Sequence, residues 1–207
     1  MGKILACKQA SAVDAEAEAG TTDRELIFLC QQGDRDCFRL LYQRYQQRVR
    51  STLYQLCGSA SLDDLVQEVF LKAWKGLPKL KKAQYFSTWL YRISWNVATD
   101  RRRKLAKGKD RTSLSENSWE KELNSNKLAS RESTPDLMQL HYQDLVQRGL
   151  DSLSFEHRAV LVLHDLEDLP QKQVAEILNI PLGTVKSRLF HARNSLKKFL
   201  ERQGISL

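Results

Sequence analysis

Apolar side chains recur every three or four residues along most of this 207-residue chain, the spacing of one face of an α-helix. The clearest run covers residues 36–57, where the apolar positions are Phe38, Leu41, Tyr45, Val49, Leu53 and Leu56. The alternation of apolar and polar residues that is typical of a strand is missing throughout. The pattern therefore predicts an all-α fold.

The first predicted helix begins at a capping box. Thr22 and Glu25 have the spacing at which each side chain can bond the other residue's backbone N–H, and apolar residues follow until Gly33 interrupts the pattern. Residues 1–21 have neither turn chemistry nor a useful apolar face, so we expect them to form a disordered tail.

Two more helices are expected after the run at 36–57. A second N-terminal box at Ser61–Asp64 precedes a helix that Gly76 and the following proline stop. A further helix is expected from about residue 84 to residue 105, with its apolar residues on one side. The four helices should form one domain over residues 22–105.

Residues 106–135 differ from their surroundings because they are rich in serine, asparagine and charge, with few apolar residues. This composition predicts a flexible linker. Helical spacing resumes in residues 136–207, where Ser154 and Pro170 mark helix starts. The predicted fold is therefore two small helical domains joined by a linker.

Positive charge is concentrated in the first domain. The chain has 33 Lys and Arg against 25 Asp and Glu, a net charge of +8, which favours a polyanionic partner. Residues 23–105 contain 16 basic and 8 acidic residues, whereas residues 106–135 contain 6 and 5, and residues 136–207 contain 9 and 9. The excess of basic over acidic residues therefore lies in residues 23–105.

The end of the chain has the pattern of a helix-turn-helix. Residues 171–178 form one predicted short helix, residues 179–183 (NIPLG) break it, and a longer helix follows to about Glu201. Gly183 lets the backbone approach another backbone or a phosphate, and the positive end of the second helix points the same way. Such a unit can place its second helix in a DNA major groove.

The second of these helices has one apolar face and one polar face. If Val185, Leu189 and Ala192 are buried, the opposite face presents a row at spacings of 3, 4 and 7, which consists of Thr184, Ser187, Arg188 and His191. Arg188 is suited to a guanine edge, and Lys186 and Arg193 to phosphate. The alternative is an ordinary amphipathic helix with a solvated basic face.

Other functional classes find little support in the sequence. No apolar run is long enough to span a membrane, and Met1–Cys7 is too short to be an export signal, so we expect a cytoplasmic protein without membrane insertion. The four cysteines form no CxxC pair, and the four histidines form no metal motif. We therefore expect no enzymatic activity, no metal and no cofactor.

Three segments together resemble the bacterial RNA polymerase sigma factors of the sigma-70 family, in its extracytoplasmic-function (ECF) group. They are DLVQEVFLKAWKGL (residues 64–77), FSTWLYRISWNVATDRRRK (residues 86–104) and GTVKSRLFHAR (residues 183–193), in the order and at the spacing of that family. The resemblance covers about residues 22–200. It implies a region 2-like first domain and a region 4-like second domain that reads the minus-35 promoter element.

The resemblance implies contacts with core RNA polymerase. The helix that contains DLVQEVF would dock on the clamp of the largest subunit, and the second domain on the flap of the second-largest subunit. Polar contacts with the clamp are expected from Asp64, Gln67, Glu68 and Lys72, and Leu65, Phe70 and Trp74 are expected to support or join them. The alternative for the acidic ones is that they only favour a helix N-terminus.

The resemblance also implies that the first domain melts and reads the minus-10 element. Single-stranded bases need aromatic faces or pockets, and their phosphates need cations. The residues expected to provide them are Lys81, Lys82, Tyr85, Phe86, Trp89, Arg92, Asn96, Arg101 and Arg103. Trp89 fits the core equally well, and the basic cluster at residues 101–104 could be a solvated helix end.

The expected function is thus promoter-specific transcription initiation together with core polymerase, and the resemblance implies a restraining anti-sigma factor. The first alternative is a helix-turn-helix regulator that acts without polymerase and dimerises through its first domain. It would bind palindromic DNA alone. The second alternative is a sigma mimic that sequesters an anti-sigma protein, although such a mimic would not need Lys186, Arg188 and Arg193.

Overall fold

The computed structural model describes residues 21–111 and 137–205, which contain helices and no strand. The first helical domain consists of α2 (Asp23–Gln31), α3 (Arg35–Cys57), α4 (Leu62–Gly76), the 3₁₀ turns η1 (Leu77–Lys79) and η2 (Ala83–Tyr85), and α5 (Phe86–Arg111). The second consists of α7 (Leu137–Asp151), α8 (Phe155–Leu161), the π-helix η3 (Val162–Leu166), α9 (Gln171–Leu178) and α10 (Leu182–Arg202). The predicted all-α class with two helical domains is confirmed.

The capping box at the start of α2 is confirmed. The Thr22 backbone N–H donates to Glu25 Oε2 at 2.8 Å, and the Glu25 N–H donates to Thr22 Oγ1 at 3.4 Å. Each side chain satisfies a backbone donor that has no partner within the helix. Asp34 caps α3 in a similar way, by accepting from the N–H of Asp36 at 2.9 Å.

The second predicted box, at Ser61–Asp64, is wrong. Ser61 precedes α4 with φ of 57°, in the left-handed region, and its hydroxyl makes no capping hydrogen bond. The start of α4 relies instead on Asp63 and Asp64, whose charges favour the positive end of the helix dipole, and on burial of Leu62. The spacing of residue types therefore located this helix but not the way it begins.

Two boundaries of α5 differ from the prediction. The helix begins at Phe86, after the separate 3₁₀ turn η2, and it continues to Arg111, beyond the expected end near residue 105. Residues 1–20 of the expected tail and residues 112–135 of the expected linker lie outside the described residues, whereas residues 106–111 continue α5. In the second domain, the Ser154 hydroxyl caps α8 as predicted, by accepting from the His157 N–H at 3.3 Å.

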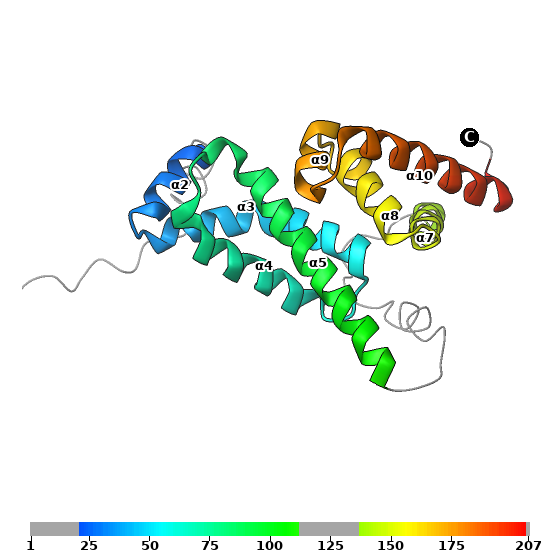
Figure 1. The fold of residues 1–207 in the computed structure, drawn as a ribbon, viewed down its shortest axis with the longest axis horizontal. Helices are drawn as coiled ribbons and strands as arrows, with labels where there is room; N and C mark the ends of the chain where they lie inside the picture. The colour runs from blue at the N-terminus through cyan, green and yellow to red at the C-terminus, as the bar shows by residue number, and fades with distance from the viewer. Residues whose placement is uncertain (1–20, 112–136, 206–207) are drawn as a thin grey trace, which may run out of the picture.

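The two domains pack against each other. Figure 1 shows α8 and α9 beside α3 and α5, with α10 on the outer side of the second domain. One cluster of buried apolar side chains runs from α2 through α5 and on to residues of α8, α9 and α10. A smaller cluster joins the α7–α8 corner to Ala192 of α10. This contact between domains fixes which surfaces of α5 are free.

Gly76 and Trp89 are matched in shape where α4 meets α5. A Cβ atom built on Gly76 would lie 2.8 Å from Cζ2 of the Trp89 indole, far inside van der Waals contact. Gly183, in the first turn of α10, has nothing within 4 Å of the same position. The two glycines thus differ in packing although both lie in helices.

We predict that Gly76→Ala destabilises the protein by about 1–3 kcal/mol, because the indole must move out of its packed position. Gly183→Ala is the matched control and should be neutral or stabilising by up to about 1 kcal/mol, since alanine is the better helix former and meets no neighbour. Urea unfolding followed by circular dichroism measures both. Equal stabilities of the two variants would contradict this packing of Gly76 against the indole.

Candidate nucleic-acid and protein interfaces

The second domain ends in the predicted helix-turn-helix. Asn179 closes α9 in the left-handed conformation, with φ of 55°, and the Ile180 N–H donates to the Ala175 carbonyl oxygen at 3.1 Å. Pro181 precedes α10 and its carbonyl oxygen accepts from the Thr184 N–H at 2.9 Å. Gly183 therefore belongs to the first turn of α10, and the chain reverses at Asn179.

The apolar face of α10 is buried as predicted. Val185, Leu189 and Ala192 are each no more than 2% exposed. On the other face Lys186, Ser187 and His191 are exposed, while Thr184 and Arg188 are half-buried. The Ser187 hydroxyl donates to the Thr184 carbonyl oxygen at 3.1 Å. The structure thus brings the predicted row together on one side of a supported helix.

Phe190 joins this row, although it was not predicted from the sequence. Its side chain is 64% exposed, and its ring centroid lies 5.5 Å from that of His191 in an edge-to-face arrangement. The signal was present, because Phe190 follows Ser187 by three residues and so lies on the same face. An exposed apolar ring beside polar groups can contact a thymine methyl group.

Arg193 is engaged in an ion pair inside the second domain. Its Nε and Nη2 donate to the two carboxylate oxygens of Asp165 at 3.0 and 2.5 Å. This bidentate bond raises the pKa of the Arg193 guanidinium. A phosphate would therefore have to share Arg193 with Asp165, whereas Lys186 is exposed at the start of the same helix.

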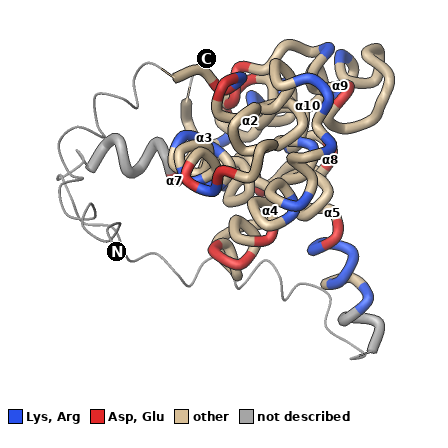
Figure 2. Tube along the Cα trace, turned by 90° about the vertical axis from the view of Figure 1, so that its left-hand side faces the viewer, with Lys and Arg blue, Asp and Glu red and all other residues tan. Residues whose placement is uncertain are grey.

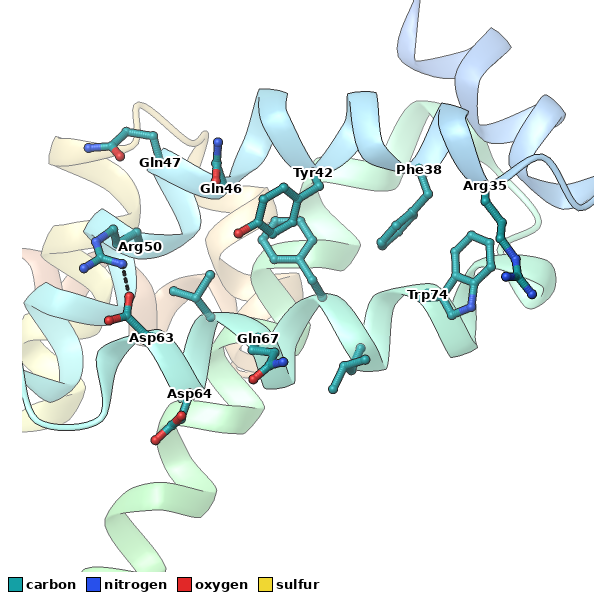
Figure 3. A pocket seen from close by; sticks show the side chains of 13 residues that line it. Arg35, Phe38, Tyr42, Gln46, Gln47, Arg50, Asp63, Asp64, Gln67 and Trp74 are labelled. Atoms are coloured by element: carbon teal, nitrogen blue, oxygen red, sulfur yellow. Dashed lines mark hydrogen bonds and ion pairs between the residues drawn. The ribbon is translucent and has the colours of Figure 1, made fainter. Parts of the chain in front are cut away.

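A groove of about 770 Å³ lies between α3 and α4 (Figure 3). Its walls include Phe38 and Trp74, whose ring centroids are 4.9 Å apart, and Tyr42, whose ring meets Phe70 edge-on at 4.6 Å. Arg50 forms an ion pair with Asp63 at one end of the groove. The groove offers a mixed aromatic and polar surface of the kind enriched in protein interfaces.

Most residues predicted to contact core polymerase lie at or near this groove, but two of them are buried. Asp64 and Gln67 are exposed and line it, and Trp74 is half-buried in its wall. Glu68 and Lys72 form an ion pair at 2.8 Å on the surface of α4. Leu65 and Phe70 are only 5% and 4% exposed and pack in the core, which favours the supporting role for both, and Phe70 also forms part of the groove wall.

Two residues that were not predicted from the sequence are better placed for a partner. Leu71 of α4 is 52% exposed and Tyr42 of α3 is 36% exposed, and both line the groove. Leu71 follows Gln67 by four residues and could have been assigned to the same face. Tyr42 could not, because only the packing of α3 against α4 brings it to this surface.

A second hollow, of about 680 Å³, lies between α2 and the segment before α5. Lys81 and Lys82 line it, together with Phe28 of α2, which is 60% exposed. The Lys82 ammonium lies 5.7 Å from the centre of the Tyr85 ring, which is 43% exposed. These cationic and aromatic groups are of the types that hold an unstacked base and its phosphates.

Gln31 holds this segment in place. Its side-chain Nε2 donates to the carbonyl oxygens of Leu77 at 3.1 Å and Leu80 at 2.9 Å. These bonds connect the end of α2 to the first residue of η1 and to the residue that follows η1. Neither Gln31 nor Phe28 was predicted from the sequence, because the contact between α2 and residues 77–84 is not local in the chain. Phe28 does lie off the buried seam of Leu26, Ile27 and Cys30.

Two aromatic residues expected to face the minus-10 strand pack inside the domain. Phe86 is 1% exposed, and its ring lies 5.3 Å from that of Tyr45, so the expectation that it contacts a base is corrected. Trp89 is half-buried against Gly76 and Phe86, which favours the packing alternative for this residue. Both instead fix the start of α5.

The polar residues of α5 are divided between solvent and the second domain. Asn96 is exposed, and Arg103 pairs with Asp100 at 3.7 Å. Arg92 donates to the Glu176 carbonyl oxygen of α9 at 2.6 Å. Figure 2 shows Lys and Arg gathered toward the C-terminal end of α5, where residues 101–104 form the basic cluster.

Among the residues that the structure describes, no group of three metal-binding side chains occurs, and none of the helices has the length and apolarity to cross a bilayer. Cys30, Cys37 and Cys57 are free thiols, and burial raises the pKa of Cys30 to about 12.

Comparisons with known proteins agree with this geometry. The model of sigma-70 region 2 matches residues 41–108, and that of sigma-70 region 4 matches residues 143–196. The chain is 34% identical over 178 residues to the ECF RNA polymerase sigma-E factor of Escherichia coli (strain K12), covering 84% of this chain and 92% of that protein. It is 29% identical to the sigma-E factor of Haemophilus influenzae, covering 87% of this chain and 96% of that protein.

Two solved structures share the fold. One is CnrH in complex with the cytosolic domain of CnrY, with a TM-score of 0.62 at 22% identity, covering 87% of this chain and 97% of that one. The other is the sigma factor RpoE in complex with the anti-sigma factor NepR from Bartonella quintana, also with a TM-score of 0.62, at 23% identity, covering 79% of this chain and 96% of that one. At these identities the likeness concerns the fold alone.

We predict that Gln31→Glu loosens the segment between α4 and α5, because it places a carboxylate against two carbonyl oxygens. The cost should be about 1 kcal/mol, with faster amide hydrogen exchange in residues 77–86. Gln32→Glu, which adds the same charge one residue later, is the control. Unchanged exchange at residues 77–86 in the Gln31 variant would argue against its role as a tie.

Proposed function

This chain belongs to the ECF group of the sigma-70 family, and from that premise we propose that it binds core RNA polymerase and directs promoter-specific transcription initiation. The observation that carries the proposal is the presence, in one chain, of a helix-turn-helix with an exposed polar row and a separate domain with a partner groove and a basic helix. A factor that recruits an enzyme to DNA needs these two kinds of surface. RNA synthesis itself is left to the polymerase.

The second domain would read the minus-35 element. Thr184, Ser187, Arg188 and His191 would face base edges from the exposed side of α10, with Phe190 against a thymine methyl group. Lys186 would contact a phosphate, and Arg193 would do so by sharing its guanidinium with Asp165. Contacts of the second domain with the polymerase flap are proposed from the family alone.

The first domain would hold the melted minus-10 strand. Lys81 and Lys82 line the hollow next to α2, where an unstacked base could be received, and the exposed Tyr85 ring lies beside the Lys82 ammonium. Further along α5, the strand would follow the polar and basic side chains of Arg92, Asn96, Arg101 and Arg103. Phe86 and Trp89 would act indirectly, by supporting the start of this helix.

The groove between α3 and α4 would receive the polymerase clamp. Asp64, Gln67, Glu68 and Lys72 would supply polar contacts, and Leu71, Tyr42 and Trp74 apolar ones. Leu65 and Phe70 would hold α4 in position from the inside.

A restraining anti-sigma protein in the cytoplasm is a further part of the proposal. One structural neighbour is a sigma factor bound to the anti-sigma factor NepR, and another is CnrH bound to the cytosolic domain of CnrY. Since the present chain shares that fold, a protein partner of the same kind is proposed for it.

Reconstitution tests the function. Mixed with sigma-free bacterial core polymerase, the protein should open and transcribe a subset of promoters from a fragmented genomic library, with start sites that share two upstream elements. An independent helix-turn-helix regulator would instead select palindromic DNA without polymerase. Palindrome selection combined with no initiation would establish that alternative.

We predict different effects for two cations of α10. Arg188→Ala should cost about 1–3 kcal/mol, mainly at one minus-35 position, because it removes a base-edge contact. Lys186→Ala should weaken binding to all sequences alike and reduce the salt dependence, because it removes a phosphate contact. Holoenzyme binding to a panel of minus-35 variants measures both. Uniform losses for both variants would remove the assignment of Arg188.

We predict that Asp64→Ala and Leu71→Ala each weaken binding to core polymerase, Leu71→Ala by about 1–2 kcal/mol, because it removes an exposed apolar contact. Both side chains are exposed, so helix content should stay unchanged. Gln43→Ala is the control, since Gln43 is an exposed residue of α3 that does not line the groove. Native affinity in both groove variants would exclude this surface as the docking site.

A further inference from the structure

Arg193 of α10 is held by a carboxylate from another element of the second domain. Its Nε donates to Asp165 Oδ2 at 3.0 Å and its Nη2 donates to Asp165 Oδ1 at 2.5 Å. Asp165 belongs to the π-helix η3, 28 residues earlier in the chain. The Arg193 side chain is 53% exposed and that of Asp165 is 29% exposed. The pair therefore lies at the surface, where Arg193 is still open to a ligand.

The pair occupies only one edge of the guanidinium group. An arginine side chain has five N–H donors, one on Nε and two on each Nη atom. Asp165 takes the Nε hydrogen and one Nη2 hydrogen, and no other partner of Arg193 is seen among the residues that the structure describes. The edge formed by Nη1 and Nη2 is thus available. It matches two oxygens of a phosphate, which a guanidinium binds through parallel N–H bonds.

Arg193 lies on the side of α10 that carries Lys186 and Phe190. The three residues are spaced at four and three positions, which is the spacing of one helix face. Lys186 and Arg193 are exposed, and Phe190 is 64% exposed. A duplex that lies against this face would meet Lys186 at one end and Arg193 two turns further on, about 10 Å away along the helix axis.

The backbone and the neighbours of Asp165 hold its carboxylate in place. Val162 and Leu163, at the start of η3, are 0% and 1% exposed and anchor this segment in the core. The His164 ring is fixed by a 2.8 Å hydrogen bond between Nδ1 and the Leu169 carbonyl oxygen, and its Nε2 lies 4.0 Å from Asp165 Oδ1. That distance is too long for a hydrogen bond. The guanidinium is therefore the group that Asp165 binds directly.

A carboxylate next to a DNA contact has two opposite effects on binding. Its negative charge repels phosphates, an effect that salt and water screen at an exposed site. It also holds a long, flexible side chain in one geometry, so the side-chain entropy of Arg193 is lost during folding and not during binding. An exposed ion pair adds little to folding stability, so stability alone is a weak reason for this pair.

Resting on the proposed function, in which α10 contacts duplex DNA, we propose that Asp165 is a positioning residue for DNA binding. It holds Arg193 so that the free edge of the guanidinium receives one phosphate of the minus-35 duplex. Because the contact is to the DNA backbone, it is the same on every sequence. Positioning outweighs the screened repulsion, so a negatively charged side chain strengthens the binding of a polyanion.

The test measures binding of the full-length protein to a labelled mixed-sequence duplex of about 30 base pairs, by fluorescence anisotropy between roughly 50 and 200 mM salt. The variants are Asp165→Asn, Arg193→Ala and the double variant. Asp168→Asn is the matched control, since it removes the same charge three residues later, where the exposed side chain has no hydrogen bond or ion pair within the described residues. Asparagine also accepts the left-handed backbone at this position, where φ is 53°.

Arg193→Ala should weaken binding about threefold to tenfold and lower the salt slope by about one, as expected for one phosphate contact. Asp165→Asn should weaken binding about threefold although it removes a negative charge, and it should cause no further loss in the Arg193→Ala background. Asp168→Asn should leave binding unchanged or slightly tighter. Native affinity of Asp165→Asn or of Arg193→Ala would overturn the proposal. An equal effect of Asp165→Asn in both backgrounds, or an equal loss in Asp168→Asn, would overturn it too.

A second measurement does not depend on the folding of any variant. Nitrogen-15 relaxation of the Nε–H groups in the wild-type chain should show that Arg193 is more rigid than Arg39, an exposed residue of α3. Equal mobility of the two side chains would refute the positioning role. None of these measurements uses polymerase, so this role can fail while transcription initiation stands. Failed initiation with the expected affinities would remove the proposed function alone.

Discussion

Helix α5 packs against the core of the first domain and against the second domain at the same time, and the arrangement of the other helices follows from that constraint. One side supplies Phe86, Leu90 and Val97 to the core of the first domain, where each is 1% exposed. Another side carries Thr88, Arg92 and Trp95 to the second domain. Since a helix presents only a limited circumference, what covers the second side decides what else α5 can bind.

The distribution of charge follows from the same arrangement. Part of the basic excess of the first domain is placed by the fold toward the C-terminal end of α5, where Lys and Arg gather (Figure 2), although Arg102 in this cluster pairs with Glu156 of the second domain. In the second domain Arg193, which flanks the exposed row of α10, is already paired with Asp165 through a bidentate bond. Attraction for a polyanion therefore comes mainly from the first domain, and the second contributes shape and hydrogen-bonding groups.

How much of this could be read from the sequence depended on whether the determining contact was local. The cap at Thr22 and the buried seam of α10 were predicted because both depend on residues three to seven positions apart. The left-handed Ser61 was missed because a capping box is a pattern of residue types and does not specify φ. Phe86 was assigned to the minus-10 strand and is buried, because periodicity cannot separate a core ring from an exposed one on a wide apolar face. The hydrogen bond from Gln31 to Leu77 and the one from Thr52 to Glu167 join residues that are 46 and 115 positions apart, so no local sequence pattern could predict them.

The exposed row of α10 has a consequence for how proteins of this design diversify. The side chains of Lys186, Ser187 and Phe190 point into solvent and carry none of the packing that holds the helix, which rests on Val185, Leu189 and Ala192. Exchanging residues of the first set changes the exposed surface of α10 at little cost in thermodynamic stability. Chains of this design can therefore vary the exposed face of α10 without first acquiring compensating mutations in the interior.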